Sequence, residues 1–133
     1  MRFQMTARTG HPDFLDLPWD TPLESWDHQR LVEVPRGLHR HVVRFVQYGA
    51  EESPEGEKGL YVLKELPRRY AEREYRFLRH LADEDVPVVD VVGVVSRRVD
   101  ASGEPLEAVL ITEHLRWSVS YTHLRAHETD SYL

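Results

Sequence analysis

Residues 60–81 read LYVLKELPRRYAEREYRFLRHL, and they predict a strand that passes directly into a helix. The run LYVLKEL at 60–66 is apolar and rich in strand-forming residues, with Lys64 in its middle. Pro67 ends this strand, because proline has no backbone N–H to donate to a neighbouring strand. Residues 68–85 are predicted to form one amphipathic helix, since apolar side chains recur at the helical period: Ala71, Tyr75, Leu78, Leu81 and Ala82.

A lysine inside an apolar strand needs an explanation. Moving an ammonium group out of water costs several kcal/mol even after the protein relaxes. The Lys64 side chain therefore either lies on a solvated strand face, where an exposed ion pair is worth little, or meets an anionic partner. The strand by itself is compatible with both arrangements.

Four more strands are predicted on either side of this unit. Leu31–Val34 and residues 41–48 form a hairpin, and the glycine- and glutamate-rich segment 49–59 forms an exposed turn. After the helix, residues 86–99 form a valine-rich strand buried on both faces, and residues 108–115 form the last strand. The sequence thus predicts an α+β fold, a five-stranded antiparallel sheet with one helix between its third and fourth strands.

The composition excludes several classes of protein. The 133 residues are 41% hydrophobic, which suits one domain, and carry a formal charge of −6, which gives no attraction to nucleic acid. Cysteine is absent, so disulfides and thiolate metal sites are excluded. No apolar stretch is long enough to span a bilayer, and the N-terminal residues lack the apolar core of a signal peptide. We therefore expect a cytoplasmic protein without a transmembrane segment.

Residues 1–30 are predicted to form an irregular N-terminal leader. The segment GHPDFLDLPWDTPLESW contains three prolines and keeps no helical or alternating pattern. Trp19 and Trp26 are expected to pin this leader to the folded body, because large aromatic side chains bury much apolar surface. The body itself is expected to comprise residues 31–117.

The order of elements and several local motifs resemble the small, nucleotide-binding lobe of protein-kinase-like enzymes. YVLK is similar to the V-A-I-K motif of their third strand, EREYRFLRHL to the first helix of aminoglycoside-phosphotransferase-type kinases, and VLITEHL to the strand that leads into the hinge. Four segments together look most like a bacterial family of unknown function that is grouped with lipopolysaccharide-core (Kdo) kinases. These segments are GLHRHVVRFV, YVLKELP, AEREYRFLRHL and VPVVDVVGVV. The resemblance covers about residues 31–117.

This resemblance implies a site for ATP, with Mg²⁺ in the intact parent protein. Lys64 would contact ATP phosphates and pair with Glu74 of the helix, and Glu72 is the weaker candidate because it lies two positions off the register. Val62 would contact the adenine ring from above. Thr112 would be the gatekeeper at the back of the adenine pocket.

The resemblance also implies backbone contacts. The Glu113 carbonyl and the Leu115 N–H would hydrogen-bond the adenine edge. Gly37 is the single glycine of PRGLHR, where kinases carry a glycine-rich loop whose backbone N–H groups approach the phosphates. Neighbouring basic residues either supply positive charge to this loop or form a solvated turn: Arg36, His39 and Arg40.

Three functions follow from these patterns. The leading hypothesis is the ATP-binding lobe of a kinase-like phosphotransferase that acts on an unknown small-molecule or sugar acceptor. The catalytic and metal-binding residues of such an enzyme would follow residue 117, so this chain alone is expected to be inactive. The single glycine of PRGLHR favours the alternative, a pseudokinase or regulatory binding module. The third hypothesis is a small α+β interaction domain that is complete as written.

The C-terminal segment departs from the pattern of the fold. VSYTHLRAHET at residues 119–129 resembles the translated read-through of a transposon-type sequencing adapter, which predicts that residues 118–133 are a non-native tail. The alternative is a genuine polar C-terminus, in which His123 and His127 lie one helical turn apart. Two histidines without a third ligand are weak support for a zinc site.

Overall fold

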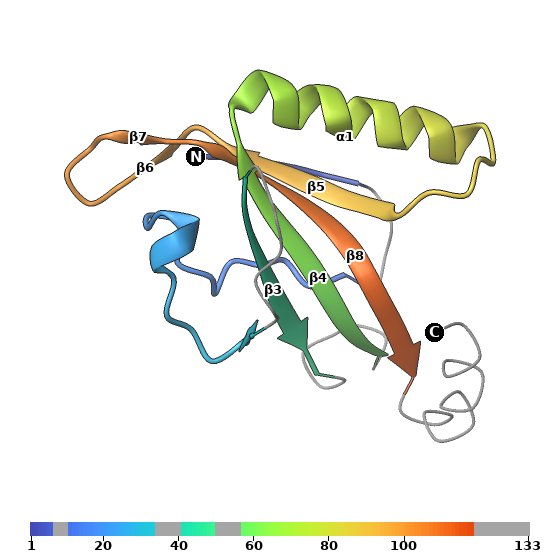
Figure 1. The fold of residues 1–133 in the computed structure, drawn as a ribbon, viewed down its shortest axis with the longest axis horizontal. Coiled ribbons are helices and arrows are strands. Elements are labelled where there is room, and N and C mark those ends of the chain that lie inside the picture. Colours follow the sequence, from blue (N-terminus) through green and yellow to red (C-terminus); the bar gives the residue numbers. More distant parts are fainter. Residues whose placement is uncertain (7–10, 34–40, 50–56, 119–133) are drawn as a thin grey trace.

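A computed structural model describes residues 1–6, 11–33, 41–49 and 57–118. Over these residues the chain forms a six-stranded sheet, with one long helix lying across one end of the strands (Figure 1). The strands stand in the order β1-β5-β8-β4-β3-β2, and every neighbouring pair is antiparallel. The predicted α+β class, with an antiparallel sheet and one helix, is therefore confirmed.

The main sheet contains β1 (Arg2–Met5), β2 (Leu31–Val32), β3 (Val42–Tyr48), β4 (Glu57–Leu66), β5 (Asp90–Ser96) and β8 (Ala108–Ser118). A separate two-stranded ribbon contains β6 (Arg98–Val99) and β7 (Pro105–Leu106). The 3-10 helix η1 spans Leu23–Ser25, and α1 spans Arg68–Asp83. The elements of the main sheet that follow the leader keep the predicted order, but the sheet has six strands in place of the predicted five.

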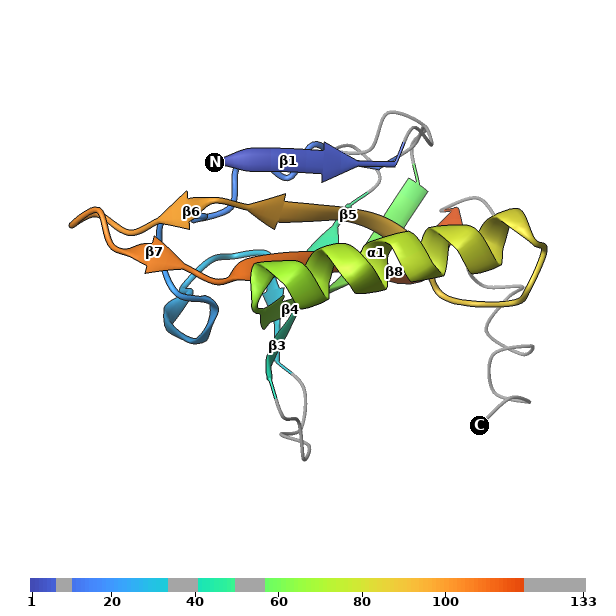
Figure 2. The ribbon, with the colours of Figure 1, turned by 90° about the horizontal axis from the view of Figure 1, so that it is seen from above.

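The sixth strand, β1, corrects the expectation that residues 1–30 are irregular throughout. β1 lies at the outer edge of the sheet beside β5 (Figure 2), with Met5 opposite Gly93. A Cβ atom at Gly93 would lie 2.4 Å from the Met5 sulfur and 2.7 Å from the Gln4 carbonyl oxygen, so glycine is what lets β1 approach this closely. Four residues carry too little alternation to reveal such a strand in the sequence.

The strand β5 is buried on both faces, as its valine-rich sequence predicts. The register between β5 and β8 shifts between Val91 and Gly93, so Val92 is the extra residue of a bulge. Val92 and Val95 consequently belong to the cluster that packs on the leader. Val91 and Val94 belong to the cluster that packs on α1. Because all four side chains are at most 8% exposed, β5 joins the two halves of the core.

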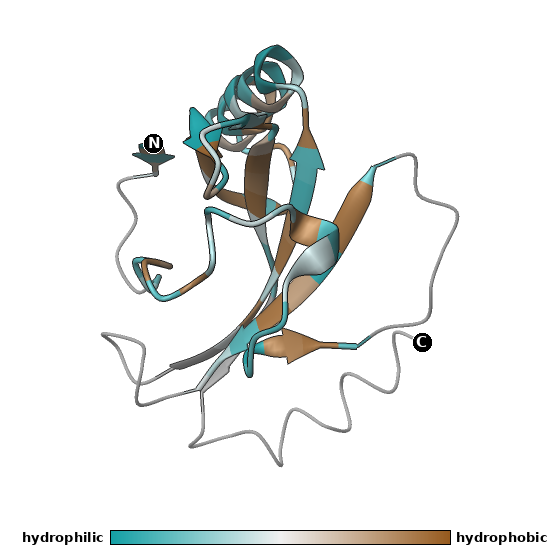
Figure 3. Ribbon diagram, turned by 90° about the vertical axis from the view of Figure 1, so that its left-hand side faces the viewer, coloured by the Kyte–Doolittle hydropathy of each residue, from teal (hydrophilic) through white to brown (hydrophobic). Residues whose placement is uncertain are grey.

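The helix α1 covers only part of one face of the sheet. It begins directly after Pro67 and buries Ala71 and Tyr75 against β5 and β8. The rest of its surface is largely hydrophilic, whereas the strands beneath it are largely hydrophobic (Figure 3). Because no loop separates β4 from α1, the end of β4 fixes the position of the first helical turns.

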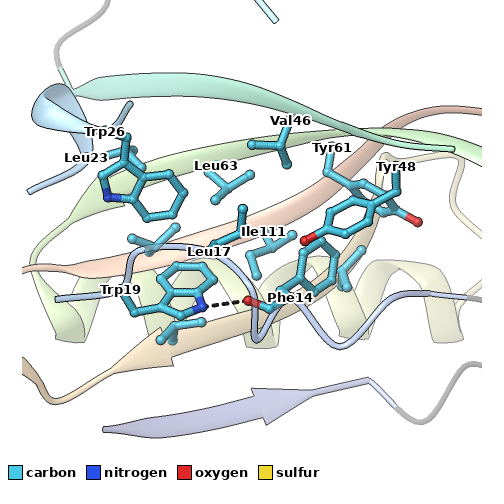
Figure 4. Packing of buried hydrophobic residues seen from close by; sticks show 13 residues of the cluster. Phe14, Leu17, Trp19, Leu23, Trp26, Val46, Tyr48, Tyr61, Leu63 and Ile111 are labelled. Atoms are coloured by element: carbon cyan, nitrogen blue, oxygen red, sulfur yellow. Dashed lines mark hydrogen bonds between the residues drawn. The ribbon is translucent and has the colours of Figure 1, made fainter. Parts of the chain in front are cut away.

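The opposite face of the sheet is covered by the leader. Trp19 and Trp26 are each 4% exposed, which confirms that these tryptophans anchor the segment. The indole N–H of Trp19 donates to the Phe14 carbonyl at 2.7 Å (Figure 4), and that of Trp26 donates to the Thr21 carbonyl at 2.8 Å. The leader and the strands contribute to one cluster: Phe14, Leu17, Trp19, Leu23, Trp26, Val46, Tyr48, Tyr61, Leu63, Val92, Val95, Val109 and Ile111.

A buried arginine joins the leader to the sheet. Arg98 is 1% exposed, and its Nη1 atom lies 3.0 Å from the carboxylate of Glu65 in β4. The same guanidinium donates, at 3.0, 2.6 and 2.8 Å, to the backbone carbonyls of Trp19, Thr21 and Glu107. A charge this deeply buried is tolerated only when such partners replace water. The path of the leader over the sheet is therefore fixed at this point.

Replacing Arg98 with methionine is expected to lower the free energy of unfolding by about 3–5 kcal/mol, because the Glu65 carboxylate loses its buried counter-ion. Urea denaturation followed by tryptophan fluorescence measures this change. Arg97→Met is the matched control, since Arg97 is exposed and its replacement is expected to cost less than about 0.5 kcal/mol. Equal denaturation midpoints for the two variants would contradict the structural role of Arg98.

A second, more exposed group ties the leader to β3. Asp16 accepts a hydrogen bond from the Tyr48 hydroxyl at 2.7 Å and pairs with Arg30, whose guanidinium lies 4.0 Å from the centre of the Tyr48 ring. Burial acts to raise the pKa of Asp16, but the hydrogen bonds from Tyr48 and Arg30 outweigh it and hold that pKa below its ordinary value of 3.8. Burial and the hydrogen bond to Asp16 raise the pKa of Tyr48.

Since the pKa of Asp16 is lower in the folded protein than its ordinary value, the ionised carboxylate stabilises the fold above pH 3.8, and this contribution is lost as the pH falls through the lower, folded value. Asp16→Asn is expected to cost about 1 kcal/mol at pH 7, because the carboxylate is 42% exposed. The difference between wild type and variant should shrink in urea titrations as the pH falls below 3.8. A difference that stays constant from neutral to acid pH would contradict this.

Candidate functional site

Lys64 lies on the face of β4 that carries α1. Successive strand residues point to opposite faces, and Leu66 packs in the cluster under α1 whereas Leu63 packs in the leader cluster. Lys64 stands opposite Leu110 of β8 and Val43 of β3, so its strand is paired on both sides. A doubly paired strand holds its backbone rigidly, which fixes where the ammonium group can reach.

The structure brings Lys64 and Glu74 together, the arrangement that the resemblance implies. The Nζ atom of Lys64 lies 3.3 Å from Oε1 and 3.2 Å from Oε2 of Glu74. Glu72, the weaker candidate, forms no ion pair with Lys64 in the described part of the chain. The Lys64 and Glu74 side chains are 32% and 36% exposed, so the ion pair stays accessible to a solute. An ammonium has three donors, and one carboxylate does not use all of them.

The ion pair opens into a cleft of about 740 Å³ at the junction of β4 and α1, a volume in the range of small-molecule sites. The cleft is lined by His41, Lys64, Leu66, Pro67, Tyr70, Arg73, Glu74 and Phe77. His41, Tyr70, Arg73 and Phe77 are missing from the sequence prediction. The sequence signal that could have found the three helix residues is their spacing from Glu74 and from each other, because positions three or four apart share one face of a helix.

Val62 and Thr112 face each other across the β4–β8 pair. Val62 is two residues from Lys64, so both side chains lie on the same face of the sheet, and Phe45 of β3 lies next to Val62 on the other side. All of these side chains are partly buried. Val62 and Thr112 do not line the cleft of Lys64, so the predicted residues form two groups along one face.

Glu113 and Leu115 follow Thr112 in β8. The side chain of Glu113 turns to the leader face, where its Oε2 atom lies 3.7 Å from Nδ1 of His11. β5 pairs with β8 no further than Glu113, which stands opposite Asp90. Among the described residues, β8 beyond Glu113 therefore has a strand partner only on its β4 side. The predicted adenine contacts involve this stretch of backbone.

Some predicted residues lie outside the described part of the chain. They are Gly37 with the basic residues Arg36, His39 and Arg40, and the histidines His123 and His127 of the segment 119–133. Ser118, expected to begin the tail, is the last residue of β8. Among the described residues, no three His, Cys, Asp or Glu side chains gather to hold a metal ion. The described residues also contain no helix long and apolar enough to cross a membrane.

No protein-family model, curated protein or solved structure matches this chain. The cleft itself presents the Lys64 ammonium held by the Glu74 carboxylate, with a second cation, Arg73, on the same wall as that carboxylate.

The Lys64–Glu74 pair is expected to contribute little to stability. In a double-mutant cycle of Lys64→Met and Glu74→Gln, we expect a coupling energy of about 0.5 kcal/mol, because both side chains are about one third exposed. Urea denaturation of the wild type, both single variants and the double variant measures it. A coupling energy above about 2 kcal/mol would show that the pair is mainly a structural contact.

Proposed function

We propose that this chain is the ATP-binding lobe of a kinase-like phosphotransferase, related in function to lipopolysaccharide-core or small-molecule kinases. The observation that carries the proposal is the Lys64–Glu74 ion pair, about one third exposed in a cleft between a central strand and the helix that follows it. β4 is the third strand after the leader, and in protein kinases a third-strand lysine pairs with a helix glutamate and holds ATP phosphates.

The chemistry of the ion pair supports phosphate binding. Phosphoryl transfer depends mainly on positioning and on charge stabilisation, so a fixed cation is more useful than a mobile one. Lys64 is held by its doubly paired strand and by Glu74, while its side chain remains 32% exposed in the cleft. A lysine kept only for stability would not need an open cleft around it.

The same face of the sheet offers a place for the nucleobase. Val62 and Phe45 present apolar surface next to Thr112, two positions along the strands from the level of Lys64. Among the described residues, no strand pairs with β8 beyond Glu113 on the side of β5. Adenine would lie against this surface, with the Glu113 carbonyl and the Leu115 N–H as its hydrogen-bond partners.

The proposal for these 133 residues is nucleotide binding. We assign no general base and no Mg²⁺ ligand to them, and the phosphate acceptor is proposed only as a small molecule or a sugar. The second candidate is a pseudokinase or regulatory binding module, which the single glycine of PRGLHR favours. The two candidates differ in phosphoryl transfer: the pseudokinase or regulatory module, joined to its large lobe, would not turn ATP over.

Calorimetric titration with MgATP tests the proposal. Lys64→Met is expected to weaken ATP binding by about tenfold or more, because a charge-assisted contact to phosphate is lost. Arg76→Met is the control, since Arg76 is exposed on α1 and does not line the cleft. The proposal fails if the wild type does not bind ATP, or if Lys64→Met binds it as tightly as the wild type does.

A further inference from the structure

We propose that Arg73 is a second phosphate-binding cation of the Lys64 cleft, so that the cleft takes the polyphosphate chain of a nucleoside triphosphate. The inference rests on the nucleotide-binding function proposed above and names the part of the ligand that this cleft selects. Arg73 comes from α1 and Lys64 from β4, yet both side chains line the same cleft. A triphosphate carries enough oxygen acceptors to contact cations from two elements at once.

Among the described residues, Arg73 lacks the ion-pair partners that a solvated helix arginine ordinarily has. It forms no ion pair with any described residue. The helix positions three and four residues away carry no acidic side chain: Arg69, Tyr70, Arg76 and Phe77. By contrast, Arg76 has Glu72 four positions before it, the favourable order for a helix ion pair. The charge of Arg73 is thus available to a ligand.

The ring of Tyr70 supports the Arg73 side chain. The guanidinium carbon of Arg73 lies 5.2 Å from the centre of this ring. Arg69 also lies over the ring, at 4.8 Å, and donates to the Tyr70 hydroxyl at 2.9 Å, so the ring is itself held. A guanidinium resting on an aromatic face keeps its planar N–H groups free for oxygen acceptors.

The charge of the cleft favours an anion. Lys64 and Arg73 contribute two positive charges and Glu74 one negative charge, an excess of one positive charge in a chain whose formal charge is −6. His41 lines the same cleft, and a ring N–H of its imidazole can donate one further hydrogen bond. Residues 35–40 contain one glycine, so side-chain donors would take the part that a glycine-rich backbone plays elsewhere.

The test is calorimetric titration of the full chain with inorganic tripolyphosphate, ATP and adenosine, at constant ionic strength. Arg73→Gln is expected to weaken tripolyphosphate and ATP by about tenfold and to leave adenosine within about twofold. Arg73→Lys should retain part of the lost affinity, because it keeps the charge but loses the planar fork. Arg76→Gln makes the same substitution three residues further along α1, and this variant should bind all three ligands as the wild type does.

The outcomes separate this inference from the proposed function. If the wild type binds ATP, and Arg73→Gln binds both tripolyphosphate and ATP as tightly as the wild type does, the role of Arg73 is overturned and nucleotide binding stands. If tripolyphosphate binds in an Arg73-dependent way and ATP binds no better than tripolyphosphate, the phosphate role holds and the adenine site fails. If the wild type binds neither, both proposals are overturned. If Arg76→Gln loses as much affinity for tripolyphosphate and ATP as Arg73→Gln does, the loss is a general effect of removing a positive charge, and the specific role of Arg73 is overturned.

Discussion

Arg98 carries a positive charge where water does not reach it, so its five N–H donors depend on the protein for partners. Glu65 and three backbone carbonyls accept four hydrogen bonds from this guanidinium, and two of these carbonyls, of Trp19 and Thr21, belong to the leader. Displacing the leader therefore breaks the hydrogen bonds that Arg98 donates to these two carbonyls. These hydrogen bonds hold the aromatic residues of the leader against one face and leave the other face to α1.

The strand β4 carries charges on both of its faces. Lys64 and Glu65 are neighbours in sequence, and the strand alternation turns them to opposite sides, toward Glu74 and Arg98. The two ion pairs differ in burial and so in what they can do. The pair on the leader side has an arginine with a side chain 0% exposed and is structural. The pair on the helix side is about one third exposed, which lets it meet a ligand.

The position of the cleft follows from the direct passage of β4 into α1. Pro67 ends the strand and serves as the N-cap of the helix, so the first turns lie beside the end of β4. Glu74 then reaches Lys64, and Tyr70 and Arg73 reach the same cleft. A longer loop would have allowed the helix to rotate, and these side chains would not share one wall. The proposed selection for polyphosphate is thus a consequence of helix register.

The sequence by itself determined the α+β class and the helix after Pro67, because these depend on local periodicity. The Lys64–Glu74 pairing is what the resemblance to a kinase small lobe implies, and the structure brings the two side chains together. Only the tertiary structure decided the rest. β1 is a strand because Gly93 leaves room for its backbone, Arg98 is buried because the leader folds over it, and Arg73 shares the cleft because α1 lies beside the end of β4. Such contacts join residues far apart in the chain or on different elements, and no local pattern encodes which of them meet.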